Sequence, residues 1–416
     1  MSLYKTIIIL FLSSLCLVRV DAQVINNEVF KESIKTVRLY PSTNEVALPV
    51  ISLNSKDQLI FTFDEISDDS KSYYYHFIHC NADWQPTDQN THEYIDGFSY
   101  ATIDDYDYSF NTVASYVHYR VQIPNMDMRI KQSGNYIISV YEDDPSKPIL
   151  TKRFIVVENA VEIRPEIKLP RTKYNYKDYQ EIIFDVHHRG ILINNPHQEI
   201  KASILQNQRW DNAHIGVQPR FIKNNLLEFD NNGSVVFEAG NEFRRFDIRS
   251  LRFNGMGIRS IQNNNAYLIL DEVRHLDKYF IESDYNGQFY IDVLEYNNRN
   301  VEADYVKVHF NFPMKAPMQD KKLYVGGIFN NYDASNDNQM KWNPASNMYE
   351  NDIILKQGFY DYMYYFLDEE GNKSVAYTEG NDYDAENEYS IIIYYRAFGE
   401  RYDRIIGYTR FNSRLQ

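Results

Sequence analysis

The sequence predicts an all-β protein made of tandem immunoglobulin-like β-sandwich domains, and three observations support that class. The 416 residues include 36 tyrosines and 24 phenylalanines, which pack well on a pleated surface and favour extended backbone. From Thr36 onward, short strand-like segments follow one another with turns between them, at the spacing of a sandwich. No long stretch has the period of an amphipathic helix.

Residues 1–22 have the three parts of a secretory signal peptide. Lys5 precedes an apolar run at residues 7–18, and Val20-Asp21-Ala22 places small residues at the cleavage positions. We expect cleavage after Ala22 and export of the chain. A lipoprotein anchor is the competing interpretation, because residues 12–16 read LSSLC; Leu15 is bulky where lipoprotein processing requires a small residue, so the cleavable signal is favoured.

The chain that remains after cleavage has one cysteine and is strongly acidic. Cys16 leaves with the signal, so Cys80 cannot form an internal disulfide. The remaining 41 lysines and arginines against 57 acidic residues give a net charge of −16, which repels nucleic acid and anionic lipid. No stretch after Val18 is long and apolar enough for a transmembrane helix. We therefore expect no nucleic-acid partner and no membrane-spanning segment in the mature chain.

The first domain is expected at residues 23–158, with seven strands that make one immunoglobulin-like unit. Gly134-Asn135-Tyr136 begins the penultimate strand, and Asp143-Asp144-Pro145 reads as the hairpin turn into the last one. The expected strands are residues 37–40, 47–53, 57–66, 72–80, 116–125, 134–142 and 149–158.

The fourth of these strands contains a group of residues that suggests a zinc site. Residues 73–84 read YYYHFIHCNADW, so that His79, Cys80 and Asp83 lie close together in sequence. Zinc needs three or four converging ligands, and no second cysteine or paired histidine lies nearby to complete a set. The stretch is therefore interpreted as a packed central strand whose histidine and cysteine are structural.

A second sandwich is expected at residues 159–313, after a linker marked by Arg164-Pro165 and Leu169-Pro170. Its expected strands are residues 179–188, 199–206, 226–230, 287–295 and 305–313.

Between these strands lies a basic segment, NEFRRFDIRSLRF, at residues 241–253. Its arginines Arg244, Arg245, Arg249 and Arg252 suggest an anion or partner site. The favoured alternative is that the guanidiniums stack on rings and pair with Glu242 and Asp247.

The third domain is expected at residues 314–416 and resembles early-set immunoglobulin domains related to starch- and glycogen-binding modules. The resemblance rests on GxFNNY at residues 327–332 and GFYDYMYYF at residues 358–366. In such modules aromatic faces stack on sugar rings, which makes Tyr332 and Trp342 the glycan-binding candidates. Tyrosine stands where those modules usually carry tryptophan, so a structural use of the fold is favoured.

No pattern of catalytic, metal or cofactor-binding residues is found. The chain lacks a GxSxG elbow, HExxH, a Walker loop, a CxxC pair and a dinucleotide fingerprint. Acidic runs at residues 64–69 and 104–107 offer carboxylates, but glycoside hydrolysis needs two that face each other across a bond. Residues 333–337 lack the glycine and terminal glutamate of a calcium loop. We expect a protein that is not an enzyme and needs no cofactor.

Several segments of the chain together form a recognisable set. In the first domain they are TVRLYPSTNEVALPVISLNSKDQLIFTFDEI, YYYHFIHCNADWQPTD, EYIDGF, DYSFNT, YRVQIPN, SGNYIISVYED and LTKRFIVVE. Further on they are QNQRWDNA at residues 206–213, PRF at 219–221 and GNEFRRFDIRSLRF at 240–253. Taken together, these segments resemble the type IX secretion system plug protein family.

The resemblance implies a non-enzymatic periplasmic component of type IX secretion. Its partner would be the giant outer-membrane β-barrel translocon, whose periplasmic opening it would bind and occlude. The alternative is a periplasmic or surface glycan-binding protein that uses Tyr332 and Trp342. The sequence assigns no residue to contact with the translocon.

Overall fold

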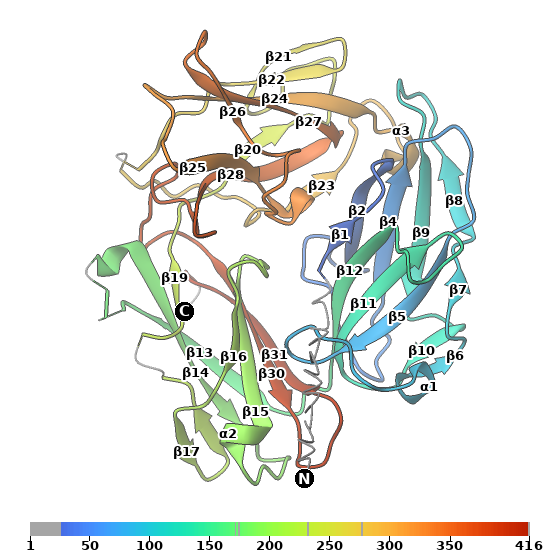
Figure 1. Ribbon diagram of the computed structural model, residues 1–416, viewed down its shortest axis with the longest axis vertical. Helices are drawn as coiled ribbons and strands as arrows, with labels where there is room; N and C mark the ends of the chain where they lie inside the picture. The colour runs from blue at the N-terminus through green and yellow to red at the C-terminus, as the bar shows by residue number, and fades with distance from the viewer. Residues whose placement is uncertain (1–25, 171, 174, 231–232, 276–277, 415–416) are drawn as a thin grey trace, which may run out of the picture.

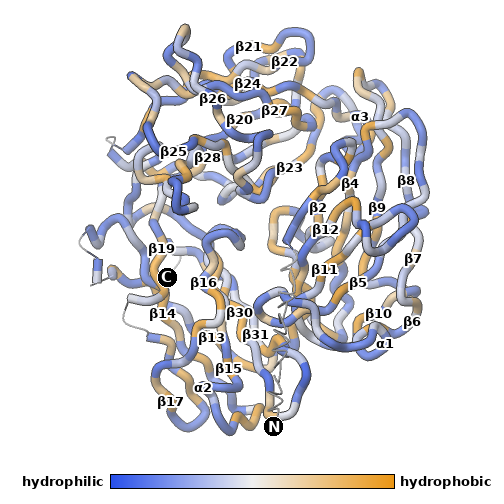
Figure 2. Tube along the Cα trace, in the orientation of Figure 1, coloured by the Kyte–Doolittle hydropathy of each residue, from blue (hydrophilic) through white to orange (hydrophobic). Residues whose placement is uncertain are grey.

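Three β-sandwiches make up the computed structural model of the chain (Figure 1). The structure describes residues 26–414 except 171, 174, 231–232 and 276–277. The predicted all-β class is confirmed, since strands in mostly antiparallel sheets dominate and the helices are short. The predicted signal peptide lies outside the described residues. Figure 2 shows apolar positions along the strands and mainly hydrophilic connecting loops.

The first sandwich contains all seven strands that the sequence predicts for it. Its larger sheet has the order β1-β12-β11-β5-β7, with β3 parallel to β12. Tyr75 and Phe77 point from β5 into the core of this sandwich, whereas Ile78 and Cys80 contact the second sandwich. The strands are β1 (Glu28–Val29), β3 (Val50–Ser52), β5 (Tyr74–Cys80), β7 (Ala101–Thr102), β11 (Gly134–Tyr141) and β12 (Leu150–Val157).

The facing sheet of the first sandwich has the order β2-β4-β9-β8. Phe61, Phe63 and Tyr119 project from it into the core, and the rings of Phe63 and Tyr119 stack at 4.9 Å. A two-stranded ribbon of β6 and β10 closes one end. The strands are β2 (Ile34–Pro41), β4 (Leu59–Glu65), β6 (Ile95–Gly97), β8 (Asp105–Tyr108), β9 (Val117–Ile123) and β10 (Met128–Ile130).

The second sandwich is built from two distant parts of the chain, which corrects the predicted division into residues 159–313 and 314–416. Strand β15 pairs with β30 along its whole length, from Ile200 opposite Tyr395 to Gln206 opposite Tyr389. Ile391 and Ile393 of β30 enter the core of this sandwich, so the apolar run near the end of the chain is buried here. The two sheets have the orders β13-β14-β18-β17, with β19 beside β14, and β16-β15-β30-β31. The strands are β13 (Glu162–Lys168), β14 (Tyr179–His187), β15 (Ile200–Gln206), β16 (His214–Val217), β17 (Phe221–Lys223), β18 (Leu226–Glu228), β19 (Val236–Glu238), β30 (Glu388–Tyr395) and β31 (Arg404–Asn412).

The third sandwich lies between those two parts, and the predicted boundary at residue 313 passes through one of its sheets. Strand β24, expected to end the second sandwich, pairs with β27 from Tyr305 opposite Lys356 to Pro313 opposite Met348. Alternate residues of β24, such as Val308 and Phe310, enter the core of the third sandwich. The sheets are β21-β22-β24-β27-β26 and β20-β28-β23, with β25 and β29 also on β28. The strands are β20 (Arg244–Asp247), β21 (Ile258–Gln262), β22 (Asn265–Leu268), β23 (Phe289–Ile291), β24 (Tyr305–Pro313), β25 (Lys321–Gly326), β26 (Lys341–Asn343), β27 (Met348–Lys356), β28 (Gly358–Asp368) and β29 (Lys373–Ser374).

Among the described residues, the helices are single turns between strands. No helix in the described part of the chain is long and apolar enough to cross a membrane. The helical turns are α1 (Thr91–Tyr94), α2 (Pro196–Glu199), α3 (Arg299–Glu302), η1 (Tyr176–Asp178) and η2 (Ile328–Asn330).

Buried contacts join the first sandwich to both others. An apolar cluster that includes Trp84 and Ile155 of the first sandwich and Ile392 and Tyr394 of the second fills one junction. The other junction is polar: Tyr116 donates a 2.8 Å hydrogen bond to the carbonyl of Ala303, next to α3 of the third sandwich. Since both junctions bury side chains, the three sandwiches form one continuous packed structure.

Candidate partner-binding surface

Contacts within the fold explain His79 and Cys80 of YYYHFIHCNADW without a metal ligand role. His79 Nδ1 lies 3.2 Å from Thr87 Oγ1, and His79 Nε2 lies 3.2 Å from the carbonyl oxygen of Ser133. Both ring nitrogens are therefore engaged within the fold. Burial lowers the pKa of His79 to about 4, despite the hydrogen bond to Ser133, and Cys80 is a buried free thiol.

The arginine-rich segment is largely internal, in agreement with the favoured interpretation. Arg244 is buried and lies 2.9 Å from both Asp271 and Glu379. Arg249 pairs with Asp247 at 2.7 Å, as expected. Glu242, expected as a second partner within the segment, instead contacts Arg414 at 2.7 Å. Ion pairs within the fold therefore use the charges of Arg244 and Arg249, and Arg252 alone of the four arginines is classed as exposed.

Tyr332 is buried beneath an arginine from the second sandwich. Only 1% of the residue is exposed, and the guanidinium of Arg209 lies 4.4 Å from the ring centroid. Tyr365 and Met363 belong to the same cluster. Because the ring is enclosed, it offers no face on which a sugar can stack.

Trp342, the other glycan-binding candidate, belongs to a different cluster. The indole is half-buried and packs edge-on against Tyr349 at 5.2 Å, at the border of the main core of the third sandwich. The structure therefore does not bring Tyr332 and Trp342 into one exposed platform.

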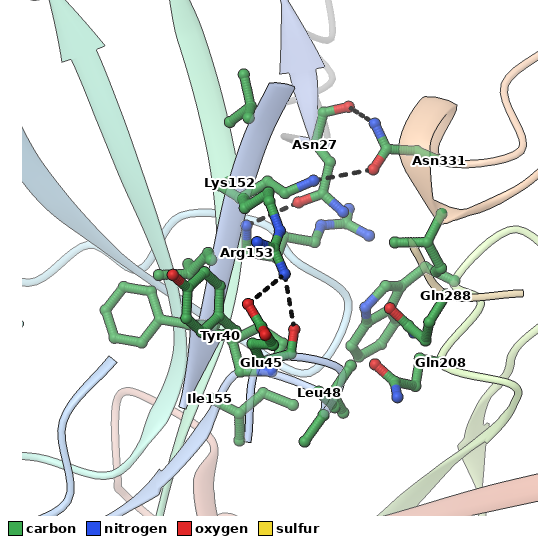
Figure 3. A pocket seen from close by; sticks show the side chains of 18 of the residues that line it. Asn27, Tyr40, Glu45, Leu48, Lys152, Arg153, Ile155, Gln208, Gln288 and Asn331 are labelled. Carbon is green, nitrogen blue, oxygen red and sulfur yellow. Dashed lines mark hydrogen bonds and ion pairs between the residues drawn. The ribbon is translucent and has the colours of Figure 1, made fainter. Parts of the chain in front are cut away.

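A small cavity lies where the three sandwiches meet. Figure 3 shows Lys152, Asn27 and Asn331 joined across it, with 3.1 Å between Lys152 Nζ and Asn331 Oδ1. Glu45 receives hydrogen bonds from Arg38 at 3.2 Å and from Arg299 at 2.9 Å. The cavity encloses about 80 Å³, well below the roughly 300–1,000 Å³ of small-molecule sites. Its lining residues bond to one another across the junction, so we interpret it as a structural contact.

A candidate surface for a partner lies along the outer edge of the first sandwich, where Figure 1 shows β8, β7 and β6 one below another. Six large apolar side chains within residues 98–113 are between 41% and 80% exposed. Exposed apolar residues are normally scattered singly, and their concentration in one part of the chain makes this surface a candidate interaction site. We call this surface the aromatic edge; its residues are Phe98, Tyr100, Tyr106, Tyr108, Phe110 and Val113.

Contacts with the core hold several rings of the aromatic edge in place. Tyr106 packs against the buried Tyr119 at 5.7 Å and meets Tyr108 at 6.1 Å. Tyr100 contacts Tyr74 at 6.0 Å. Rings that are already ordered lose little conformational entropy when a partner covers their exposed faces.

Strand β8, in the middle of the aromatic edge, has one open side. Among the described strands β8 pairs only with β9, and all four of its residues are exposed. An edge strand presents free N–H and C=O groups to which an extended segment of another chain can add. Beyond β8, the backbone N–H of Phe110 bonds to Val301 of the third sandwich at 2.8 Å.

The aromatic edge is acidic as well as apolar. Asp104, Asp105 and Asp107 are exposed, and none forms an ion pair with a described residue. Charge complementarity therefore favours a basic partner. Sequence reasoning considered these carboxylates only for catalysis. The signal it missed is the alternation of Tyr106, Tyr108 and Phe110 with polar residues, at a place where the apolar face is not covered.

Comparisons with known proteins give a family match, several similar solved structures and one negative result. A family profile described as "Type 9 secretion system plug protein 1st domain" matches residues 34–158. A crystal structure of a hypothetical protein from Parabacteroides merdae is 34% identical, with a TM-score of 0.89, and the alignment covers 93% of this chain and 98% of that one. No curated protein matches the chain significantly.

Proposed function

The chain belongs to the type 9 secretion system plug protein family through its first domain, and from this membership we propose that it binds the outer-membrane translocon barrel and occludes its periplasmic opening. The family is a secretion component and not a known enzyme family, and it suggests a location in the periplasm or envelope. In the proposal the protein is periplasmic, is exported by its signal peptide and acts without catalysis.

The observation that carries the proposal is the aromatic edge, which lies inside the matched residues 34–158. Exposed aromatic side chains supply much of the binding free energy in protein interfaces. We propose that the translocon contributes an extended, basic segment that adds to the open side of β8 and covers Phe98 and Phe110.

The packing between sandwiches supports occlusion. A protein that blocks a pore has to keep its shape when it is seated in the opening. The apolar cluster around Trp84 and the hydrogen bonds between Tyr116 and the third sandwich resist movement of one sandwich against another. The three domains would therefore fill the opening as a unit.

The test is purification of the translocon barrel from solubilised outer membranes with and without this protein. We expect the two to co-purify, and we expect the purified barrel to conduct ions more strongly when the protein is absent. Recovery only as a free protein, together with a pore conductance that does not change in its absence, would overturn the proposal.

A further inference from the structure

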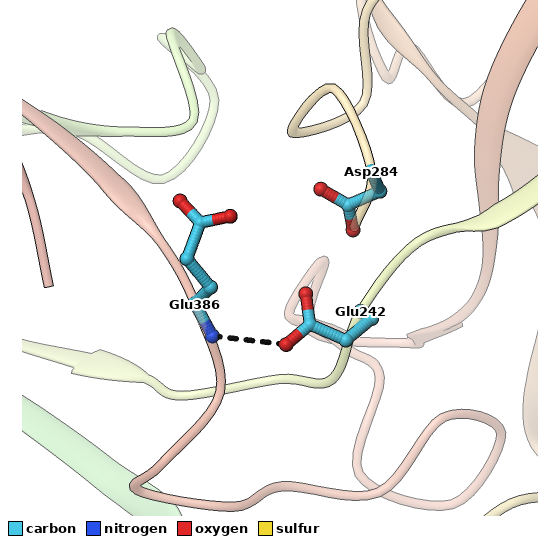
Figure 4. Close-up of side chains that lie close together, drawn as sticks. All are labelled: Glu242, Asp284 and Glu386. Atoms are coloured by element: carbon cyan, nitrogen blue, oxygen red, sulfur yellow. Dashed lines mark hydrogen bonds between the residues drawn. The ribbon is translucent and has the colours of Figure 1, made fainter. Parts of the chain in front are cut away.

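Three carboxylates from separate segments meet where the second and third sandwiches join. Glu242 lies between β19 and β20, Asp284 lies in the loop between β22 and β23, and Glu386 precedes β30. One carboxylate oxygen from each lies within 4.8 Å of the others (Figure 4). The group therefore connects the segment between β19 and β20, the loop that carries Asp284 and the segment that leads into β30.

Glu242 has a buried carboxylate oxygen without a donor. The residue is 1% exposed. Its Oε1 accepts hydrogen bonds from the backbone N–H of Glu386 at 3.2 Å, from Arg414 at 2.7 Å and from the hydroxyl of Tyr279. Its Oε2 has no partner in the described part of the chain, and Figure 4 shows the carboxylate facing Asp284. A buried anionic oxygen without a donor is costly unless a cation compensates it.

A neighbouring amide offers a further oxygen. Asn286 Nδ2 lies 3.2 Å from Glu386 Oε1, while Asn286 Oδ1 is buried without a partner among the described residues. Rotation of the amide by half a turn exchanges the two atoms. Asn286 can thus present oxygen in place of nitrogen toward Glu386.

Only one of the three carboxylates is in an ion pair with a described residue. Arg414 alone in that part of the chain pairs with any of them, at Glu242. Since like charges crowd together in a partly buried place, a dication would relieve their repulsion.

We propose that Glu242, Asp284 and Glu386 bind a divalent cation of the calcium type. All the available ligands are oxygens, which calcium prefers and zinc does not. Oxygens on opposite sides of a calcium ion lie roughly 5 Å apart, whereas magnesium draws them to about 4 Å. The cation fixes the loop that carries Asp284 against both sandwiches. This site goes beyond the proposed function and does not depend on it.

The experiment uses the mature chain, residues 23–416, after treatment with EDTA. Calorimetric titration with calcium chloride is expected to show one ion bound per chain, and excess calcium is expected to raise the melting temperature. Terbium is expected to luminesce when tyrosines are excited, because the hydroxyl of Tyr279 contacts Glu242. Asp284→Asn combined with Glu386→Gln is expected to weaken calcium binding about tenfold or more, since affinity follows the number of charged ligands.

The matched control is Asp337→Asn, which removes an exposed carboxylate elsewhere in the third sandwich and should leave calcium binding unchanged. Circular dichroism in EDTA verifies that each variant folds. The proposal is overturned if calcium gives neither heat nor a shift in melting temperature, or if the double variant binds as tightly as the parent. A melting temperature that responds to mild acid and not to calcium would also overturn it, because Glu242 and Asp284 would then share a proton.

Discussion

Lys356 Nζ lies 2.6 Å from Asp64 Oδ2 across the junction of the first and third sandwiches. The side chains are 2% and 1% exposed, and Asp64 also contacts His118 Nδ1 at 2.6 Å and the hydroxyl of Tyr305 at 2.7 Å. Lys356 donates a second hydrogen bond to the carbonyl of Asn300 at 2.7 Å. Lys356 and Asp64 therefore make all these contacts only when the first and third sandwiches hold this relative position.

Removal of one member of this pair should destabilise the protein strongly. Lys356→Met leaves Asp64 buried without its counter-ion, and breaking such a pair costs about 3–5 kcal/mol. Urea unfolding followed by circular dichroism measures the loss in free energy of unfolding. Lys307→Met, at an exposed position of β24, is the control and should change that free energy by no more than about 0.5 kcal/mol. Equal stability of the two variants would show that the pair is not buried in solution.

Strand pattern predicted which residues are extended but not which strands pair. The patterns of residues 199–206 and 305–313 both indicate strands. Nothing in either pattern specifies β30 or β27 as the partner, since alternation reports a buried face and not its neighbour. The contact between Asp64 and Lys356 is equally hidden, because two isolated charges give no signal of their pairing.

The candidate site was similarly hard to predict. The GxFNNY motif suggested an exposed ring at Tyr332, but Arg209 of another sandwich covers it. Conversely, Tyr106 and Tyr108 lie outside the strands expected from the sequence, and they were not among the candidate site residues. Exposure depends on what the rest of the chain places on a surface, and a local pattern does not contain that information.

A fragment of residues 314–416 should not fold by itself. It lacks β24, which pairs with β27, and it contains β30 without its neighbour β15. Core residues of two sandwiches would then be exposed to water. Circular dichroism with thermal melting is expected to show no cooperative transition, in contrast to the mature chain. A sharp melting transition of the fragment would instead support the linear division of domains.

The buried His79 should make the protein less stable in mild acid. Burial lowers its pKa from 6.5 to about 4, so the unfolded chain binds a proton that the folded chain excludes. The contribution to stability is complete above about pH 6.5 and is lost as pH falls toward 4, by about 3 kcal/mol in all.

The measurement is the free energy of unfolding against pH for the parent and for His79→Gln. The variant should show a flatter curve between about pH 6.5 and 4, whatever it loses in packing at neutral pH. His92→Gln, at an exposed position, should keep the parental slope. A parental slope in His79→Gln would assign the acid sensitivity to other groups.

Cys80 should be unreactive in the folded protein. Burial raises the pKa of its thiol to about 12, and only the thiolate attacks maleimides and disulfides at a useful rate. Maleimide labelling followed by mass spectrometry should find no label on the native mature chain and one label after unfolding in urea. Rapid labelling of the native chain would mean that the junction between the first and second sandwiches opens.

Loss of aromatic side chains from the aromatic edge should weaken binding to the translocon without unfolding the protein. Phe98 and Phe110 are each 65% exposed, so Phe98→Ser with Phe110→Ser should alter the free energy of unfolding by less than about 1 kcal/mol. If the rings contact the barrel, recovery of the protein with it should fall about tenfold or more, because buried aromatic residues contribute most to interfaces.

The control for this pair removes two rings of other sandwiches that are at least as exposed. Phe253 and Phe398 are 75% and 99% exposed, and Phe253→Ser with Phe398→Ser should leave co-purification unchanged. Asp105→Asn with Asp107→Asn should slow association chiefly at low salt, since the charges attract a basic partner over a distance that salt shortens. If the control pair reduces recovery as much as the pair at the aromatic edge does, recovery depends on the hydrophobicity of the whole surface. The aromatic edge would then not be the contact with the translocon.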